Sequence, residues 1–329
     1  MLNRRDTLQK RSNLLQQVRA FFYARSVLEV DTPMLSQAAT PDVHLASLSS
    51  QLQVPGYKEP KTYYLHTSPE YPMKRLLCEG SGDIFYLGKV FRNGDLSPRH
   101  QIEFSMLEWY RLGFSMFQLI DEVIELIQIA MQFHADLPLE VETLSYQQVF
   151  AKYAHIENVF NATAEDYQAC LKKHNIAEIV GVDNDDKDLW EQLVLTEVIE
   201  PQLGNHQGKP TISVMYHYPA KDAALAQVCE DNPLVAERFE VFVNGMELAN
   251  GYHELADATI YRQRFTEALQ QRQTLGLPAV PLDENLLQTL NQQTLPDCSG
   301  VALGIDRLFA LQQNLSNLQQ GICFGIEDA

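Results

Sequence analysis

VAERFEVFVNGMELANGY, at residues 235–252, decides the fold of this 329-residue chain. Apolar and β-branched residues flank an Asn244-Gly245 pair, which favours the positive φ angles of a tight turn, so the stretch predicts a β-hairpin. Carboxylates recur every seven residues, at Glu240, Glu247 and, just beyond the stretch, Glu254. Because an unpaired buried carboxylate is costly, glutamates among so many apolar neighbours predict internal ion pairs or bound cations.

The sequence on either side of this hairpin predicts further strands and helices. Pro33 cannot donate to a β-ladder, so the strand before it is expected at a sheet edge. Helical spacing and β-branched runs predict these elements: helices at 7–25 and 259–275, and strands at 27–35 and within 83–112. We therefore expect residues 1–329 to form a single α+β domain, an antiparallel sheet flanked by helices, with a mainly helical lobe at about 136–210.

Charge is distributed unevenly along the chain. With 25 Lys and Arg against 43 Asp and Glu, the formal net charge is −18, which argues against a protein that wraps nucleic acid with its whole surface. The first 25 residues are basic by contrast, with six Lys and Arg and one acid, Asp6. This end predicts either a docking site for an acidic macromolecule or an ordinary solvated helix face.

Cysteines and apolar runs bear on the compartment. The five cysteines are widely spaced and form no CxxC pair, which favours free thiols in a reducing environment. The apolar run near 114–133 is interrupted by Asp121, Glu122 and Glu125, so it predicts an amphipathic helix and not a membrane span. We expect a cytoplasmic protein with no membrane partner.

Three basic side chains stand in apolar or small-residue surroundings. Arg92 follows Phe91, His100 lies just before a predicted strand, and Arg307 follows the small residues of GVALGID. Arginines in such places commonly bind planar anions in a bidentate manner, although a buried Arg–Glu pair is the alternative for each. Together with the hairpin glutamates, they predict a site for a nucleoside triphosphate and Mg²⁺.

The same segments, in the same order, resemble a known family. FRN at 91–93 with RHQIEFSMLEWY at 99–110 is similar to motif 2 of class II aminoacyl-tRNA synthetases of the lysyl type. ERFEVFVNGMELANGYHEL at 237–255 and GVALGIDRL at 300–308 resemble motif 3, and VLEVDTPML at 27–35 resembles motif 1. The resemblance implies the class II catalytic fold and a homodimer formed through motif 1.

TPDVHL at 40–45, TSPEY at 67–71 and PDCSGVALGIDR at 296–307 are most similar to the elongation factor P lysine ligase family. That resemblance implies an enzyme that activates (R)-β-lysine with ATP and Mg²⁺ and transfers it to a lysine side chain of elongation factor P. The chain begins almost at motif 1 and leaves no room for an N-terminal anticodon-binding barrel, so we expect no tRNA substrate. Elongation factor P would dock near the basic N-terminal helix.

The resemblance also implies roles for individual residues. Arg92 would hold the α-phosphate, with Arg307 as the second catalytic residue facing the β- and γ-phosphates beside His100, and Phe104 would stack on adenine. The remaining implied residues fall into three groups: further ATP-binding residues Asn93, Gly94, Gln101, Leu248 and Gly304; Mg²⁺ ligands Glu240 and Glu247, the latter also contacting ATP; and amino-acid-binding residues Ser68, Glu70, Tyr110, Glu254 and Ala302.

The sequence departs from the family pattern at three places. Gly94 and then Asp95 stand where a glutamate is usual, HQIEF replaces HNPEF at 100–104, and Ala302 replaces a glycine of lysyl-tRNA synthetases. The first two changes predict altered or weaker ATP binding, and the added methyl group predicts preference for a differently shaped lysine isomer. A truncated lysyl-tRNA synthetase-like enzyme acting on α-lysine or tRNA, and a weakened paralogue that binds without catalysis, are alternatives.

Overall fold

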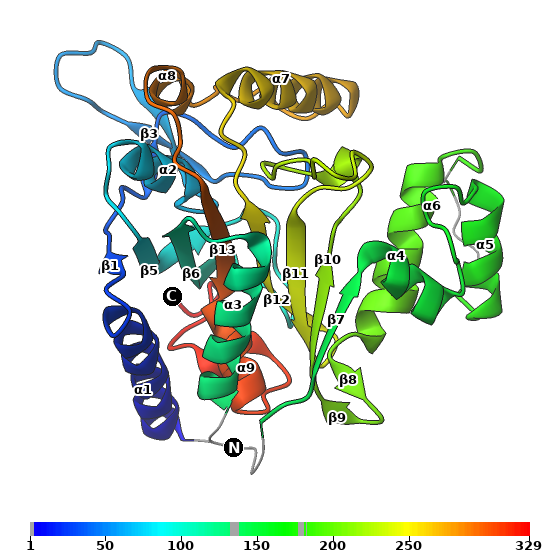
Figure 1. The fold of residues 1–329 in the computed structure, drawn as a ribbon. Coiled ribbons are helices and arrows are strands. Elements are labelled where there is room, and N and C mark those ends of the chain that lie inside the picture. Colours follow the sequence, from blue (N-terminus) through cyan, green and yellow to red (C-terminus); the bar gives the residue numbers. More distant parts are fainter. Residues whose placement is uncertain (1–2, 132–137, 177–180, 182) are drawn as a thin grey trace.

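The fold is organised around one eight-stranded sheet (Figure 1), in a computed structural model that describes residues 3–131, 138–176, 181 and 183–329. Its strands, in spatial order, are β1 (Leu28–Glu29), β5 (Ile84–Phe91), β6 (Glu103–Leu112), β13 (Cys298–Gly304), β12 (Met246–His253), β11 (Arg238–Val243), β10 (Ile212–Tyr216) and β7 (Val141–Ser145). The inner strand pairs are antiparallel, as predicted.

The two edge strands differ from the prediction of an antiparallel sheet. β1 runs parallel to β5, and β7 runs parallel to β10. Each of these pairs is joined by a long excursion of the chain, which is what a parallel connection requires. The strand expected before Pro33 is short but does lie at the sheet edge.

One face of the sheet is buried by three helices, α1 (Arg4–Tyr23), α3 (Met116–Met131) and α9 (Ile305–Gln312). Phe22 of α1 stacks on Phe85 of β5 at 4.7 Å between ring centroids and meets Trp109 of β6 edge-on at 5.2 Å. All three rings are fully buried. Burial of this much aromatic surface anchors α1 to the sheet, since each such ring contributes several kcal/mol of apolar burial.

The opposite face is only partly covered. The helices α2 (Glu70–Cys78), α7 (Ala258–Thr274) and α8 (Glu284–Gln292) share an apolar cluster with β5 and β6. A small sheet of β2 (Leu35–Ser36), β4 (Lys61–Leu65) and β3 (Ser49–Leu52) lies next to α2 in Figure 1. The middle of the large sheet is left to line a cavity on this face.

Helices between β7 and β10 build a lobe with its own apolar core, seen at the right of Figure 1. Its elements are α4 (Tyr146–Val149), the π-helix η1 (Phe150–Ala154), α5 (Ala164–Lys173), α6 (Lys187–Val194), the π-helix η2 (Leu195–Ile199) and the short η3 (Glu200–Gln202). Within the expected span of about 136–210, residues 141–145 instead form β7 of the main sheet, and 136–137 lie outside the described residues. A two-stranded ribbon, β8 (Asn205–His206) with β9 (Lys209–Pro210), ends the lobe, and the short turns η4 (Ala220–Asp222) and η5 (Leu318–Gly321) lie elsewhere in the chain.

Candidate active site

The predicted hairpin is present as β11 and β12, and a β-bulge decides where its carboxylates point. Leu248 has no partner, because the register changes from Val241 opposite Ala249 to Phe242 opposite Glu247. On a regular strand, successive side chains alternate between the two faces of the sheet. Residues separated by an odd number of positions, as Glu247 is from Asn250 and Glu254, would therefore point to opposite faces. The extra residue therefore brings Glu247 onto the same face as Glu254, facing the cavity.

That face lines a cavity of about 470 Å³ over β6, β11, β12 and β13. Fourteen of the sixteen residues implied by the resemblance line it: Ser68, Glu70, Arg92, His100, Gln101, Phe104, Tyr110, Glu240, Glu247, Leu248, Glu254, Ala302, Gly304 and Arg307. Asn93 and Gly94 are not part of the lining. Segments separated by more than two hundred residues in sequence thus meet at one site.

Arg92 and Phe104 form one end of the cavity. The Arg92 guanidinium carbon lies 5.2 Å from the Phe104 ring centroid. Arg92 Nε is buried without a hydrogen-bond partner among the described residues, and burial lowers the pKa of this guanidinium. A buried guanidinium nitrogen without a partner is costly, so this end is prepared for an anion beside an aromatic ring.

Arg307 and His100 form a second basic group at the same end. Arg307 Nη1 donates to the Glu247 carbonyl oxygen at 2.8 Å, and Arg307 Nη2 lies 2.7 Å from His100 Nε2. Burial, and then the positive charge of Arg307, lower the pKa of His100. The neutral ring therefore accepts from Arg307 at Nε2 and donates from Nδ1 to Ser97 Oγ at 2.9 Å.

Gly94, Asp95 and Gln101 depart from the family pattern of motif 2, and the structure shows where each of them lies. Gly94 adopts φ 86°, and a Cβ placed there would meet open space, so this glycine serves a turn. Asp95, one residue later, lines the cavity, and its charge partly offsets the lowering of the pKa that burial causes at Arg92 and His100. Gln101 is buried with Nε2 free of hydrogen-bond partners in the described part of the chain. An acid is thus present near Arg92, displaced by one position.

Oxygen donors gather where β11 and β12 face each other. Asn250 Nδ2 donates to Glu240 Oε1 at 3.0 Å, and Arg238 Nη2 donates to the same oxygen at 2.6 Å. Asn250 Oδ1 is buried and has no partner within the described ranges. Burial raises the pKa of Glu240, and the Glu247 charge raises it further. A bound cation would give the Asn250 oxygen a partner and would offset the repulsion between the Glu240 and Glu247 carboxylates.

This donor set fits Mg²⁺, which prefers carboxylate and carbonyl oxygens and usually keeps several waters. Residues 3–131, 138–176, 181 and 183–329 contain no group of three or more His, Cys, Asp and Glu side chains spaced to hold a metal. The site consists instead of two carboxylates and one amide oxygen. Asn250 was not among the residues predicted from sequence, because only the bulge at Leu248 reveals that it shares a face with Glu247.

The other end of the cavity is acidic, but its carboxylates already have a cation. Lys74 of α2 is fully buried, with Nζ 2.6 Å from Glu70 Oε1 and 2.7 Å from Glu254 Oε2. Tyr261 OH lies 2.8 Å from the same nitrogen. Glu70 and Glu254, which the sequence predicted to bind the amino-acid substrate, therefore each place one oxygen against Lys74.

Glu108 adds a third carboxylate at this end that the sequence prediction omitted. Tyr110 OH donates to Glu108 Oε1 at 2.8 Å, while Glu108 Oε2 is buried without a partner in the part of the chain that the structure describes. Burial, and then the charge of Glu70, raise the pKa of Glu108 to about 8. Ala302 lies directly between Glu108 and Asn250 in the strand register.

Gly300 makes room for two of these side chains. A Cβ at Gly300 would lie 2.3 Å from Tyr110 Cε1 and 2.5 Å from Glu254 Oε1, which no packed side chain tolerates. Glycine is therefore required for Tyr110 and Glu254 to approach the sheet. The sequence pattern GVALG suggested close approach of backbone to ligand, and the structure adds close approach of protein side chains.

Comparisons with known proteins place this site in a family. A family model for class II tRNA synthetases (D, K and N) matches residues 2–328. The elongation factor P--(R)-beta-lysine ligase of Haemophilus influenzae (strain PittGG) is 44% identical over 322 residues, which cover 98% of this chain and 95% of that protein. The ligase of the same name from Hamiltonella defensa subsp. Acyrthosiphon pisum (strain 5AT) is 42% identical over 325 residues, or 98% of this chain and 96% of that one.

The chain belongs to the elongation factor P--(R)-beta-lysine ligase family. Within that family its fold is the class II synthetase fold, as the motif resemblance implied. The mixed sheet flanked by helices agrees with the expected α+β class.

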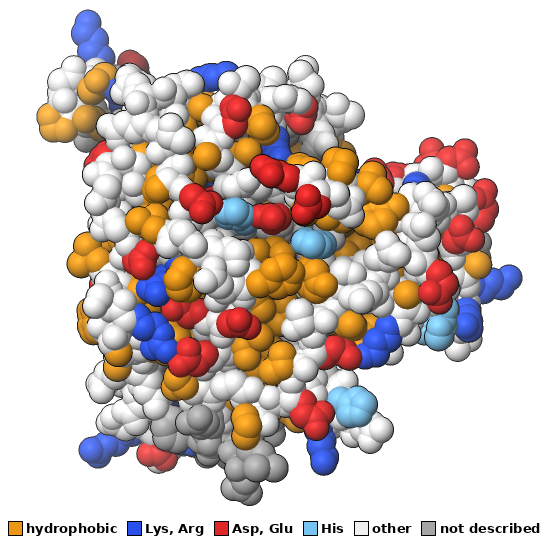
Figure 2. Space-filling model, viewed as in Figure 1, with side chains coloured by type: hydrophobic (Ala, Val, Ile, Leu, Met, Phe, Trp, Pro, Cys, Tyr) orange, Lys and Arg blue, Asp and Glu red, His pale blue; other side chains and the backbone are white. Residues whose placement is uncertain are grey.

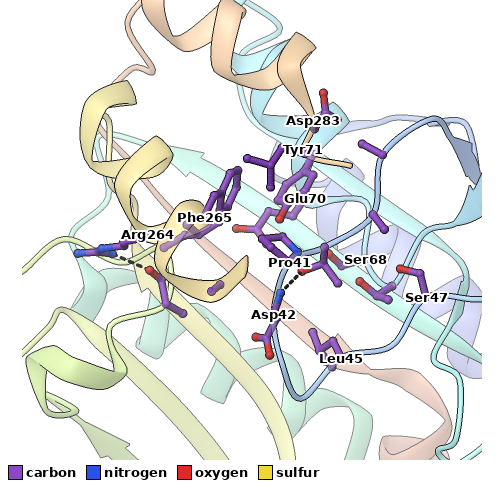
Figure 3. Close-up of a pocket in the computed structure, with 18 of the residues that line it drawn as sticks. Pro41, Asp42, Leu45, Ser47, Ser68, Glu70, Tyr71, Arg264, Phe265 and Asp283 are labelled. Atoms are coloured by element: carbon purple, nitrogen blue, oxygen red, sulfur yellow. Dashed lines mark hydrogen bonds between the residues drawn. The ribbon is translucent and has the colours of Figure 1, made fainter. Parts of the chain in front are cut away.

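A second, larger cavity of about 1180 Å³ adjoins the ligase-family site (Figure 3). Both cavities are lined by Asp42, Ser68, Glu70, Arg238 and Tyr252, so the larger one opens onto the acidic end of the smaller. Its outer wall is formed by α7, where Arg264 Nη1 donates to the Ala224 and Ala226 carbonyl oxygens. The larger cavity therefore adjoins the end of the smaller one that carries Glu70.

The basic N-terminal helix of this ligase-family chain is less available than its sequence suggests. Arg11 forms an ion pair with Asp306, Arg19 pairs with Glu29 at 3.0 Å, and Arg25 with Glu125 at 2.5 Å. The helix also packs on the sheet face opposite the cavity. Acidic side chains are spread over the face shown in Figure 2. Docking of elongation factor P near this helix stays a prediction, with less free positive charge than expected.

Membrane attachment by a spanning helix has no candidate within the described ranges. None of the helices there has both the length and the apolar character needed to cross a bilayer.

Proposed function

We propose that this chain is an ATP-dependent ligase that activates (R)-β-lysine as an adenylate and transfers it to a lysine side chain of elongation factor P. The observation that carries the proposal is one cavity with two opposite ends. A half-buried Arg92, whose Nε has no partner among the described residues, lies beside Phe104 and suits a nucleotide. The carboxylates of Glu70, Glu108 and Glu254 suit an amino acid with two ammonium groups. The whole chain would act as one catalytic unit, with the helical lobe attached at its side.

Activation requires positioning and charge stabilisation and no protein nucleophile. An oxygen of the substrate carboxylate attacks the α-phosphorus of ATP, and the bond to pyrophosphate breaks. Arg92 would offset the charge that grows on the α-phosphate oxygens, while Arg307 and His100 would receive the departing pyrophosphate. Phe104, close to Arg92, offers a face on which adenine can stack, and Gln101 Nε2 offers a free donor near the base.

Mg²⁺ would be held by Glu240, Glu247 and Asn250 through oxygen atoms. When bound, it would offset the negative charge of the phosphates. Arg238 would keep Glu240 oriented by its hydrogen bond at 2.6 Å. Arg307, anchored on the Glu247 carbonyl oxygen, links the metal ligands to the phosphate-binding group.

Substrate recognition would depend on charge and shape at the acidic end. Glu70, Glu108 and Glu254 carry three negative charges when ionised, and Lys74 returns one positive charge, so two ammonium groups complete the balance. Tyr110 orients Glu108, and Ser68 lines the wall between the cavities. The methyl group of Ala302 beside Glu108 would favour the β-amino isomer over α-lysine.

Transfer to the protein completes the reaction. The acceptor lysine nitrogen, after losing its proton, attacks the carbonyl carbon of the adenylate, an amide bond forms, and AMP leaves. The larger cavity, which opens at Ser68 and Glu70, would admit that side chain. No tRNA substrate is part of this proposal.

A homodimer in the cytoplasm is the proposed working form. Tyr23 of α1, Leu28 of the edge strand β1 and Leu35 of β2 are exposed by 56%, 57% and 41%. An unpaired strand edge with apolar neighbours favours association with a second copy. All five cysteines are free thiols, in keeping with a reducing compartment. Light scattering over a range of concentrations tests the dimer, and a monomer throughout would contradict it.

Two measurements test the ligase function. ATP–pyrophosphate exchange should be faster with (R)-β-lysine than with α-lysine, and elongation factor P should gain the mass of one β-lysyl group. Faster exchange with α-lysine would point to the synthetase-like alternative. No exchange with either amino acid would leave a protein that binds without catalysis, and an unchanged mass of elongation factor P would remove the proposed acceptor.

A further inference from the structure

Lys74 is the one buried ammonium that touches two carboxylates of the amino-acid end in the described part of the chain. Its side chain is 0% exposed, and its Nζ lies 2.6, 2.7 and 2.8 Å from Glu70 Oε1, Glu254 Oε2 and Tyr261 OH. Burial alone would favour the neutral amine, but the facing carboxylates of Glu254 and Glu70 raise the pKa of Lys74 well above its usual value. Lys74 is therefore an ammonium ion with three oxygen neighbours.

The position of Lys74 relative to the cavity is informative. Glu70 and Glu254 line the cavity of about 470 Å³, whereas Lys74 and Tyr261 do not. Lys74 thus contacts the two carboxylates from behind, on the side away from any ligand. The ion pair with Glu254 uses Oε2, while Oε1 lies beside Gly300 and Tyr110 within the cavity wall.

One ammonium also ties together three elements of the fold. Glu70 and Lys74 are four residues apart on α2, Glu254 follows the end of β12, and Tyr261 belongs to α7. Two carboxylates this close repel each other, and without a cation one of them would rotate away or take up a proton. Either change would remove a negative charge from the place where a substrate ammonium must bind.

We propose that Lys74 is a positioning residue for amino-acid activation, which holds the carboxyl groups of Glu70 and Glu254 aimed into the cavity so that each keeps one oxygen for an ammonium group of the substrate. This inference rests on the proposed function and deepens it. Lys74 does not touch the substrate; it acts through the two glutamates. It also sets the net charge of the pocket, so that a ligand with two ammonium groups fits better than a ligand with one.

A purely structural role for Lys74 makes a different prediction. Loss of a buried ion pair lowers stability wherever it lies, because a charge is left unpaired. A structural defect alone would lower Tm and affect the use of ATP and of the amino acid alike. A positioning role raises the KM for the amino acid and leaves the KM for ATP close to its original value.

The test uses Lys74→Met in the full chain, with KM for (R)-β-lysine, KM for ATP, kcat and Tm all measured by pyrophosphate exchange and thermal unfolding. We expect KM for the amino acid to rise at least about tenfold, equivalent to about 1.4 kcal/mol, with KM for ATP changed less than about twofold. Lys152→Met is the control for loss of a lysine elsewhere, because it removes a half-exposed lysine of the lobe that pairs with Glu142 of β7 and lines neither cavity.

Two further variants keep the test decisive if Lys74→Met folds poorly. Tyr261→Phe removes one hydrogen bond to Lys74 and keeps every charge, so a smaller rise in the same KM is expected. In a cycle with Glu254→Gln, the effects of the two substitutions should be less than additive, because both act on one contact. Exchange without amino-acid selectivity in the wild type would defeat the proposed function itself. An active wild type in which Lys74→Met and Tyr261→Phe leave the amino-acid KM unchanged, or raise both KM values equally, would overturn the role of Lys74.

Discussion

Tyr110 OH donates to Glu108 Oε1 at 2.8 Å, and the two residues lie on the same face of β6 because they are two positions apart. Gly300 and Ala302 face them on β13 in exact register, with side chains small enough to leave a cavity. This arrangement of four residues places the buried carboxylic acid of Glu108 at the floor of the amino-acid site.

The stability of the protein should depend on the protonation of Glu108. Burial raises its pKa to about 8, so the folded protein binds more protons than the unfolded chain between pH 4.5 and about 8. Stability from this group is therefore lost as pH rises through that window. Glu108→Gln cannot ionise, and we expect it to gain about 1 to 4 kcal/mol relative to the wild type on going from pH 5 to pH 8.

Urea unfolding at the two pH values measures this difference. Glu103→Gln is the control on the same strand, because Glu103 is exposed and pairs only loosely with Lys89 at 3.3 Å. Parallel pH profiles for the wild type and Glu108→Gln would mean that Glu108 is ionised in the free protein. If Glu108→Gln is more stable than the wild type at pH 8 but uses (R)-β-lysine less well, the Glu108 carboxyl group lowers stability and contributes to substrate binding.

Metal dependence should be sensitive to Asn250. Its Oδ1 is buried without a partner among the described residues, and its Nδ2 holds Glu240. We expect Asn250→Ala to raise the Mg²⁺ concentration for half-maximal pyrophosphate exchange at least about fivefold, with smaller change in the KM for (R)-β-lysine. Asn205→Ala serves as the control, because Asn205 lies in the β8–β9 ribbon, where its side chain bonds Asn244 and the Gly208 backbone, and it does not line the cavity. Equal Mg²⁺ requirements in the two variants would contradict the assignment.

Much of the site could be predicted from the sequence, because motif residues determine chemistry directly. Asn244-Gly245 predicted the hairpin, and φ values of 52° and 67° are found there. The positions of Arg92, Phe104 and Arg307 followed from the order of motifs, and they line one cavity. For these features, the type of residue and its neighbours in the sequence are enough for a prediction.

Other features depend on contacts between distant segments and gave no local signal. The bulge at Leu248 decides that Glu247, Asn250 and Glu254 share a face, and nothing in MELANGY marks which residue is left unpaired. Lys74 stands beside Arg75 on a short helix, yet only Lys74 is fully buried, because Glu254 and Tyr261 arrive from β12 and α7.

Room at Gly300 should be essential for amino-acid use. A methyl group there would lie 2.5 Å from Glu254 Oε1 and even closer to Tyr110, so one of these side chains must move. We expect Gly300→Ala to reduce kcat/KM for (R)-β-lysine at least about a hundredfold, equivalent to about 2.8 kcal/mol, and to leave nucleotide binding nearly unchanged. Calorimetric titration with ATP and exchange kinetics with the amino acid measure the two effects separately. Equal losses of ATP binding and of amino-acid use in Gly300→Ala would contradict the steric argument.

Selectivity between lysine isomers should depend on Ala302. Its methyl group lies in register between Glu108 and Asn250, at the floor of the cavity, so Ala302→Gly deepens the pocket without moving a charge. One methyl group changes discrimination by about 1 to 3 kcal/mol, so the ratio of kcat/KM for (R)-β-lysine over α-lysine should fall about 5- to 150-fold. Pyrophosphate exchange with each isomer gives that ratio. Leu303→Ala, on the same strand but with its side chain in the core on the opposite side, separates selectivity from general loosening of the sheet, because it should lower Tm and leave the ratio unchanged. A ratio in Ala302→Gly equal to that of the wild type would mean that the pocket distinguishes the isomers by its carboxylates alone.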